Sequence, residues 1–317
     1  MACSLAVLIT YYNEKELLTE CLNSIFAQTV PVDQIIIYDD ASSFPATDYI
    51  PPGFPVRVIR GEENGGPGFG RNELLKTTKC EYVHFQDADD LFHSDWCRQV
   101  KESIAKTQAD VVLTEISSYK EGSLVCEKVM GLDRLSEISD LIKFALMGSI
   151  LVPSTTFRRD IALSSGGYRT KDILPQSEDF DFHVRLAATG ATYAIINKPL
   201  IIQRLRENSH SQNTKLCYTS AIKSITLLSE ELSTEYHNDL AEASARIGSV
   251  LYKMGAKSEA KEAFILANQL GQPYFLFQGK IYRIIARRLG QNYAEISSLI
   301  YRKILPKYLR KFIRGNS

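Results

Sequence analysis

Three carboxylates fall within four residues, in Asp87-Ala88-Asp89-Asp90. They directly follow residues 82–85, a short apolar run that predicts a buried strand, so they stand where that strand leaves the sheet. Mutual repulsion makes such a cluster costly unless positive charge lies among the carboxylates. A divalent cation that holds a diphosphate is one candidate, because hard cations take oxygen ligands and share them with phosphates. The alternative is an Asp-rich turn that caps the following helix.

Strand and helix signals alternate along the first half of the chain. Short apolar runs predict strands, and apolar residues at helical spacing predict helices, the first with Asn13 as its N-cap. The predicted strands are 5–9, 34–38, 56–59, 82–85 and 110–114, and the predicted helices are 14–28, 71–77, 94–106 and 182–188. This alternation indicates an α/β fold with a largely parallel sheet. Ligands bind beyond the carboxyl ends of such strands, so residues 39–40, 64–66 and 87–90 are expected at one edge.

Six short motifs, in this order, resemble a family 2 glycosyltransferase of the GT-A fold. They are residues 8–14 (LITYYNE), 35–42 (IIIYDDAS), 64–72 (NGGPGFGRN), 86–90 (QDADD), 166–168 (GGY) and 177–181 (SEDFD) with Arg185. Each motif is weak alone, and the set in order is far more specific. The Gly-rich segment matches neither a dinucleotide-binding fingerprint nor a P-loop. The resemblance covers about residues 4–206. It implies a Rossmann-like, mostly parallel sheet flanked by helices, and an inverting, metal-dependent enzyme of the hexosyltransferase type.

The resemblance also implies which residues bind a nucleotide-sugar. Tyr11 and Tyr12 can stack on a nucleobase, and Asp39 matches the family's base-reading carboxylate, which can accept a hydrogen bond from uracil N3. Arg71 can neutralise phosphate or orient an acidic loop. The implied donor-binding set is Thr10, Tyr11, Tyr12, Glu14, Asp39, Asn64, Gly65, Arg71, Asp87, Ala88, Glu178 and Arg206. A core position for Tyr12 and a structural ion pair for Arg71 are the alternatives.

The metal site and the catalytic base follow from two acidic motifs. Asp87-Ala88-Asp89 matches the family's D-x-D motif, which implies that Asp87 faces the ribose or the metal. Asp89 then binds Mn²⁺ or Mg²⁺ bridging the donor diphosphate, while Asp90 caps or supports. Asp179 matches the catalytic base, which deprotonates an acceptor hydroxyl as it attacks the anomeric carbon opposite the leaving group. The alternative for Glu178-Asp179 is capping of the helix that follows.

The sequence departs from the family pattern in three places. Thr10-Tyr11 stands where the first strand usually ends in a Pro-Thr or Pro-Ala pair. Residues 203–206 read QRLR where the family often has Tyr-Arg-x-His, so Arg206 replaces a His that contacts diphosphate or metal. His210 can substitute as a metal ligand, although a lone loop His is more often merely solvated. The third departure is a helical C-terminal extension.

The extension predicts two domains, a GT-A glycosyltransferase domain at 1–214 and a helical region at 215–317. Within the second, apolar and small residues match one tetratricopeptide-like helical hairpin: Ile247, Gly248, Leu251, Ala260, Phe264 and Ala267. A lone unit cannot build a solenoid, so a plain hairpin is the alternative.

Charge is unevenly distributed along the chain. Lys+Arg and Asp+Glu both total 37, yet residues 280–317 hold ten basic residues and one acid, a net charge of +9 that leaves −9 on residues 1–279. Apolar residues recur at helical spacing among these bases. The pattern predicts an amphipathic tail that binds an anionic membrane surface. The alternative is that its apolar faces pack on the catalytic domain.

The remaining signals concern location, acceptor and rival functions. Six scattered cysteines without metal-site spacing fit a reducing cytoplasm, and no signal peptide or membrane span is evident. We expect a cytoplasmic enzyme, peripheral on the inner face of the membrane, that transfers sugar from a UDP-sugar to a glycan or lipid-linked saccharide of a bacterial surface polysaccharide. Acceptor contacts are expected at 153–156 and 166–174, and no nucleic-acid partner is expected.

Two other functions remain open. A nucleotidyltransferase should show a Gly-rich loop with Arg and Lys after the first strand, where this chain has Thr10-Tyr11-Tyr12-Asn13. An inactive adaptor would bind partners through its helical tail, and donor hydrolysis by the purified protein would exclude it.

Overall fold

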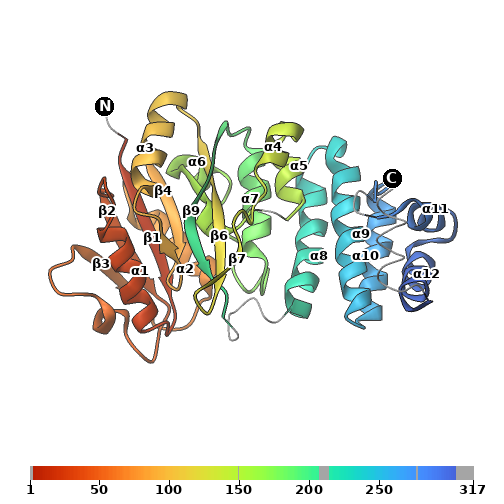
Figure 1. Cartoon of the computed structure of the whole chain (residues 1–317), viewed down its shortest axis with the longest axis horizontal. Coiled ribbons are helices and arrows are strands. Elements are labelled where there is room, and N and C mark those ends of the chain that lie inside the picture. The colour runs from red at the N-terminus through yellow and green to blue at the C-terminus, as the bar shows by residue number, and fades with distance from the viewer. Residues whose placement is uncertain (1–2, 149, 207–213, 276–277, 305–317) are drawn as a thin grey trace. The chain divides into compact units, whose positions relative to one another are not determined.

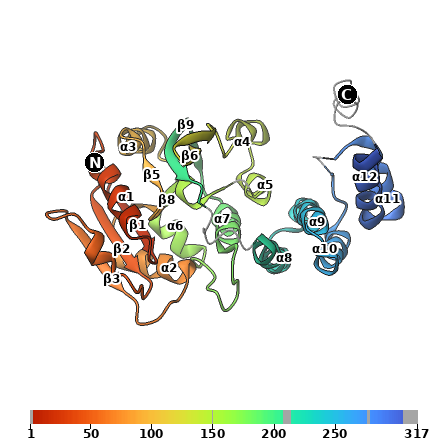
Figure 2. The same cartoon turned by 60° about the horizontal axis from the view of Figure 1, so that its bottom comes forward.

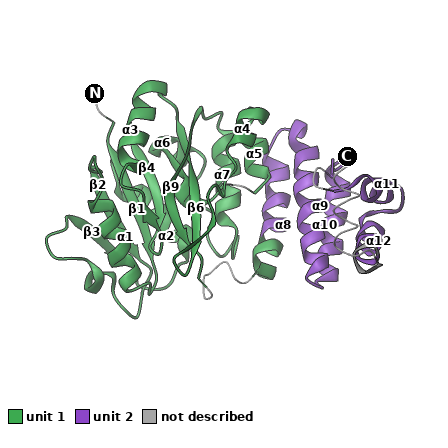
Figure 3. Cartoon of the chain, in the orientation of Figure 1, with its two compact units in different colours: residues 1–220 green, residues 221–317 purple. Residues whose placement is uncertain are grey.

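The computed structural model describes residues 3–148, 150–206, 214–275 and 278–304, with the backbone alone for 301–304. The chain divides into two compact units, Met1–Ser220 and Ala221–Ser317 (Figure 3). The sequence predicted a boundary at 214/215, whereas the observed division falls inside helix α8 (Thr214–Glu231).

A mixed sheet forms the centre of the first unit (Figure 1), with strand order β3-β2-β1-β4-β8-β6-β9-β5 and β7 paired to β6. The strands are β1 (Leu5–Tyr11), β2 (Gln34–Asp39), β3 (Val56–Arg60), β4 (Tyr82–Asp87), β5 (Leu91–Phe92), β6 (Val111–Lys120), β7 (Ser123–Cys126), β8 (Thr155–Arg158) and β9 (Tyr193–Arg204). β3, β2, β1 and β4 run parallel, and β8 lies antiparallel to both β4 and β6. The predicted α/β class and the predicted strands are confirmed.

Helices lie on both faces of this sheet (Figure 2). They are α1 (Glu16–Phe26), α2 (Pro67–Thr77), α3 (Trp96–Thr107), α4 (Asp133–Ile138), α5 (Leu141–Leu146), α6 (Arg159–Ser164) and α7 (Glu178–Ala188). α2 packs on β1 and β2, while α3 packs on β6 and β9. Asn13 is not the N-cap of α1, because that position is Lys15. The Asn13 side chain instead accepts a hydrogen bond from the Phe44 N–H at 3.1 Å.

Strand register brings the acidic segments together. Tyr11 pairs with Asp39 across β1 and β2, and Thr10 pairs with Asp87 across β1 and β4. The carboxyl ends of the three strands are therefore level, which is the arrangement the alternating elements predicted. The strands reach this edge through buried apolar residues, since Leu5, Leu8 and their neighbours are fully inaccessible to solvent. A rigid, dry sheet thus fixes where its polar ends lie.

The second unit is helical. It contains the rest of α8, then α9 (His237–Lys253), α10 (Lys257–Leu270), α11 (Lys280–Leu289) and α12 (Gln291–Ile304). α9 and α10 pack as a hairpin around the predicted positions, with Leu251, Ala260, Phe264 and Ala267 buried. The tetratricopeptide resemblance stays a prediction, because a single hairpin of this kind has the same packing. No helix in the described residues is both long enough and apolar enough to span a membrane.

Gly248 provides a test of the hairpin. A Cβ added there would lie 2.4 Å from the Phe264 ring and 3.2 Å from the Ala260 carbonyl oxygen. Gly248→Ala should therefore lower the free energy of unfolding by about 1–3 kcal/mol, the usual cost of overpacking, in urea denaturation. Gly279→Ala is the matched control, because an added Cβ there meets nothing within 4 Å. A Gly248→Ala protein as stable as this control would contradict the observed helix contact.

Candidate active site

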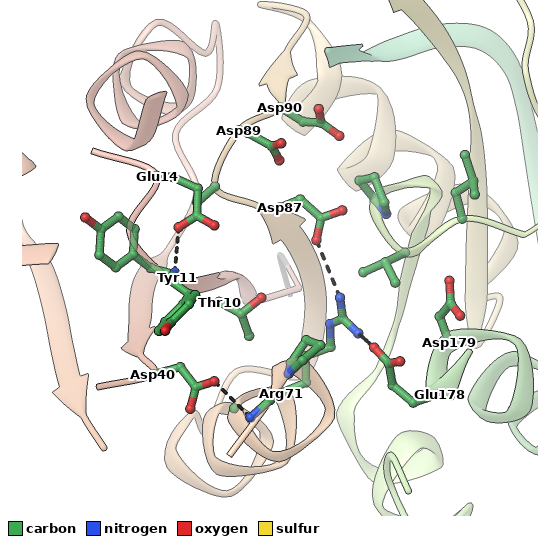
Figure 4. A pocket seen from close by; sticks show the side chains of 18 of the residues that line it. Thr10, Tyr11, Glu14, Asp40, Arg71, Asp87, Asp89, Asp90, Glu178 and Asp179 are labelled. Atoms are coloured by element: carbon green, nitrogen blue, oxygen red, sulfur yellow. Dashed lines mark hydrogen bonds and ion pairs between the residues drawn. The ribbon is translucent and has the colours of Figure 1, made fainter. Parts of the chain in front are cut away.

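A cavity of about 720 Å³ opens where β1, β2 and β4 end (Figure 4). α2, the start of α7 and the end of β9 complete its walls. The sequence-predicted residues that line it are Thr10, Tyr11, Tyr12, Glu14, Asn64, Arg71, Asp87, Ala88, Asp89, Glu178, Asp179 and Arg206. Asp39 and Gly65 do not line it, and His210 lies outside the described residues. Of the predicted acceptor segments, only Pro153 reaches the cavity.

Arg71 is the buried cation of the site. Its side chain, only 6% exposed, donates from Nη1 to Glu178 Oε1 at 2.7 Å and from Nη2 to Asp87 Oδ1 at 3.5 Å (Figure 4). Burial opposes the charged form, but Glu178 and Asp87 outweigh it and keep the pKa of Arg71 above its ordinary value. The alternative of a structural ion pair is thus what the structure shows. Contact with a nucleotide stays a prediction.

The Asp87–Asp90 cluster does not cap a helix, because the N-cap of α3 is Asp95. Asp89 Oδ2 accepts from Arg206, at 2.9 Å from Nε and again from Nη2. Asp90 is buried and accepts from the Arg204 backbone N–H at 2.9 Å. Burial, followed by repulsion from Asp87 and Asp89, raises the pKa of Asp90 well above its usual range. All three aspartates line the cavity, but Asp90 is the most buried and holds the Arg204 backbone.

Asp87 and Asp89 fit a divalent ion that is shared with a diphosphate. Their side chains are 37% and 18% exposed, and both line the cavity. Within the described part of the chain, no group of three or more His, Cys, Asp or Glu side chains could hold a metal ion. Mg²⁺ usually keeps several waters and takes one or two carboxylates plus substrate phosphates. This pair suits that mode, because phosphate oxygens would complete the coordination.

Asp40, and not Asp39, is the cavity carboxylate at the end of β2. Asp39 is 1% exposed and accepts from the Ser42 and Ala46 N–H groups at 2.8 and 2.9 Å and from Arg60 at 2.7 Å. It holds the following loop and has no access to the cavity. The sequence motif carries two adjacent aspartates, and successive residues of a strand point to opposite sides. The motif alone could not decide between them.

The Asp40 carboxylate organises the Gly-rich loop. It accepts from the backbone N–H groups of Gly65 at 2.7 Å and Gly66 at 2.9 Å. Gly66 has a φ of 82°, a left-handed conformation that favours glycine. The Gly65 amide is thus engaged by Asp40 in this structure.

The two tyrosines differ in exposure. Tyr11 is 1% exposed, donates its hydroxyl to the Phe44 carbonyl at 2.8 Å, and has its pKa raised to about 12 by burial. Tyr12 is 51% exposed, which excludes the alternative of a core aromatic. Glu14 accepts from the Tyr12 N–H at 2.5 Å, and burial raises its pKa to about 7. The Tyr12 ring is therefore available for stacking, whereas Tyr11 forms part of the cavity wall.

Asp179 stands in the first turn of α7. Ser177 occupies the N-cap position without a side-chain cap bond, and Asp179 Oδ1 accepts from the Phe180 N–H at 2.8 Å. Carboxylates are favourable at this end of a helix, so a structural contribution is real. Burial, and next the neighbouring Glu178, raise the pKa of Asp179 to about 6. Such a carboxylate changes charge close to neutral pH, as a general base requires.

Comparison with known proteins decides the family. The profile of Glycosyl transferase family 2 matches residues 6–162. This part of the chain belongs to that family. It contains β1, β2, β4 and the D-x-D segment, and the match argues against the nucleotidyltransferase alternative.

Individual relatives and solved structures are similar to this chain in sequence or in fold. The poly(ribitol-phosphate) beta-glucosyltransferase of Bacillus spizizenii is 34% identical over 119 residues, which are 35% of this chain. The chain spans 19% of that relative's length and 66% and 52% of the length of two other curated relatives. Staphylococcus aureus TarS 1-349, solved in complex with UDP-GlcNAc, matches with a TM-score of 0.70 at 19% identity. The match covers 95% of this chain and 92% of the TarS chain. A Pyrobaculum calidifontis mannosyltransferase, solved with GDP-Man and Mn²⁺, matches with a TM-score of 0.59 at 16% identity. This match covers 96% of this chain and 88% of the mannosyltransferase chain. The fold is GT-A.

The different positions of Asp39 and Asp40 predict different consequences for their variants. Asp39→Ala should lower the free energy of unfolding by about 1–3 kcal/mol, because buried donors lose their acceptor. Asp40→Ala also removes the acceptor of the Gly65 and Gly66 N–H groups, but it should in addition weaken binding of UDP, because Asp40 lines the cavity and Asp39 does not. Urea denaturation and calorimetric UDP titration measure the two effects. The opposite pattern, with nucleotide affinity lost only in Asp39→Ala, would restore Asp39 as the nucleotide-binding carboxylate.

Proposed function

We propose that this chain is an inverting, metal-dependent glycosyltransferase of the hexosyltransferase type that uses a UDP-sugar. The observation that carries the proposal is that Asp87, Asp89 and Asp179 line one cavity. Two of these carboxylates suit an ion bound to the diphosphate, and the third suits activation of an acceptor hydroxyl. The family membership of residues 6–162 supports the same class of reaction.

The nucleoside end of the cavity suits uridine. Tyr12 offers an exposed ring for stacking on the base, and Thr10 and Asp40 add polar groups on the same wall. The TarS structure of the same fold is solved with UDP-GlcNAc, which supports a UDP-sugar donor. Asp40 can accept a hydrogen bond from uracil N3 if it exchanges one of its bonds to the Gly-rich loop.

The diphosphate belongs between the acidic cluster and the arginines. Arg206 is 36% exposed, lines the cavity and pairs with Asp89, so its guanidinium can reach a phosphate from that position. Asp87 and Asp89 would hold Mn²⁺ or Mg²⁺, which when bound offsets the charge that develops on the departing nucleoside diphosphate. Arg71 keeps Asp87 oriented from the opposite side.

Transfer itself requires one proton acceptor. Asp179 takes the proton of an acceptor hydroxyl, and the hydroxyl oxygen attacks the anomeric carbon. The bond from that carbon to the diphosphate breaks as the new glycosidic bond forms, so one displacement inverts the configuration. The proton ends on Asp179, and the nucleoside diphosphate carries the electron pair away.

The acceptor is proposed to be a glycan or lipid-linked saccharide in the synthesis of a bacterial surface polysaccharide, on the cytoplasmic side of the membrane. Leu151, Val152 and Pro153 line the same cavity as Asp179 and offer an apolar wall for a sugar face. The relative named for poly(ribitol-phosphate) glucosylation supports a polymer acceptor.

A metal test follows from the proposed ion site. UDP should bind at least about tenfold more tightly in Mn²⁺ or Mg²⁺ than in EDTA, a difference of about 1.4 kcal/mol, and Asp89→Ala should remove that difference. Isothermal titration calorimetry measures both affinities. Asp160→Ala, an exposed carboxylate on α6, is the matched control and should keep the full metal effect. Equal wild-type affinity with and without metal would contradict the ion site.

A second test concerns the base. Asp179→Asn keeps the shape and removes the basicity, so turnover should fall by about 10²–10⁴ with little change in UDP affinity. Turnover is followed as UDP release from a panel of UDP-sugars. The wild-type rate should rise with pH, pass half of its maximum where half of Asp179 is deprotonated and level off above that pH, because burial and Glu178 raise the pKa of Asp179 to about 6.

Asp160→Asn is the control for this test, since Asp160 is exposed on α6 and lies outside the segments expected to contact the acceptor. An Asp179→Asn protein with near-normal turnover would place the base elsewhere. A wild-type protein that binds UDP but releases none from any UDP-sugar would favour the inactive adaptor.

A further inference from the structure

The outer surface of α11 and α12 is strongly apolar. The described large apolar side chains that are at least 36% exposed on these helices are Ile281, Ile284, Leu289, Tyr293, Ile296, Leu299 and Ile300. In α12, Tyr293, Ile296 and Ile300 are three and four residues apart, so they share one helix face. Single exposed apolar residues are ordinary, whereas seven of them on two consecutive helices indicate an interaction surface. We call this set the α11–α12 surface.

The α11–α12 surface is not needed to hold the helices in place. Their inner faces are already packed, because Tyr282, Ala286 and Ala294 form a buried cluster with Ala245 of α9 and Ala267 of α10. The Tyr282 hydroxyl also donates to Glu295 at 2.8 Å inside this cluster. The exposed isoleucines and leucines lie on the other side, where the described residues provide no core.

The charged side chains exposed beside the α11–α12 surface have one sign. Lys280, Arg283, Arg287 and Arg288 are all exposed on α11. The acid of these two helices, Glu295, is fully buried. Six more Lys and Arg residues and no acid occur at 301–317, of which the structure describes no side chain. The described side chains of α11 and α12 therefore present positive charge together with apolar groups.

We propose that the α11–α12 surface binds an anionic lipid bilayer, with both helices lying in the membrane interface. Apolar side chains of such helices enter the acyl boundary while Lys and Arg stay at the headgroups. Each basic residue near an anionic surface contributes about 1 kcal/mol. A second copy of the chain fits less well, because a two-fold interface would bring identical basic surfaces together. A soluble anionic polymer would pair the bases but leave the isoleucines in water.

The α11–α12 surface can be tested with the full chain and lipid vesicles, without any sugar donor. The protein should co-sediment with vesicles that contain phosphatidylglycerol at low salt, and much less with pure phosphatidylcholine. High salt should release it, because salt screens the headgroup attraction. Arg287→Ala with Arg288→Ala should weaken partitioning about 30-fold, since two basic contributions are lost. Ile284→Asp with Ile300→Asp should abolish it.

Matched controls use exposed residues of α10. Ile265→Asp should retain binding, and so should Lys257→Ala with Lys261→Ala, because these positions lie outside the α11–α12 surface. UDP affinity, measured on every variant, shows that the first unit remains folded. Circular dichroism melting of each variant shows that its helices remain folded.

Four results would overturn the proposal. The first is a full chain that ignores anionic vesicles at low salt. The second is equal loss of binding in the α10 controls. The third is salt-sensitive binding that Ile284→Asp with Ile300→Asp leaves intact, which would indicate an anionic ligand held by charge alone. A concentration-dependent dimer in light scattering that the same double variant dissociates would identify a second copy as the partner.

Discussion

The buried guanidinium of Arg71 is the interaction on which the arrangement of the site depends. It ties α2 to the end of β4 through Asp87 and to the start of α7 through Glu178, which is 107 residues away in sequence. A buried charge is tolerated only when its partners and hydrogen bonds are in place. Here the partners are the D-x-D segment and the residue beside the proposed base. One cation therefore holds the two halves of the proposed chemistry in the same cavity.

Arg204 and Arg206 contact different members of the acidic cluster at 87–90. Arg204 holds the loop through its backbone bond to Asp90 and its side-chain bonds to the Asp89 carbonyl and to Glu20. Arg206 covers the Asp89 carboxylate from the cavity side. Burial raises the pKa of Glu14 to about 7 and that of Asp179 to about 6. The cavity thus contains carboxylates suited to different roles, because they differ in burial and in whether an arginine pairs with them.

The second unit is held together by different interactions. Its helices pack through small and aromatic residues, with Gly248 giving the Phe264 ring the space that a Cβ would occupy. The last described helices bury their one acid and expose their isoleucines and bases. In the first unit buried charge organises a cavity, whereas in the second the basic side chains of α11 lie on the surface beside exposed apolar side chains. That difference is why the two units suggest different kinds of partner.

The sequence by itself determined the fold class, the strand positions and most of the cavity. Periodicity is a local property, and parallel topology brings the ends of neighbouring strands to one edge, so residues such as Asn64 and Asp87 could be placed in advance. Only the tertiary structure decided between Asp39 and Asp40. Asp39 ends β2 and is held by backbone N–H groups of the loop at 42–46, whereas Asp40 follows the strand and lines the cavity. The tertiary structure also moved the N-cap of α1 from Asn13 to Lys15, since Asn13 bonds a loop 31 residues away. Contacts of this kind join residues distant in sequence, and no local pattern encodes them.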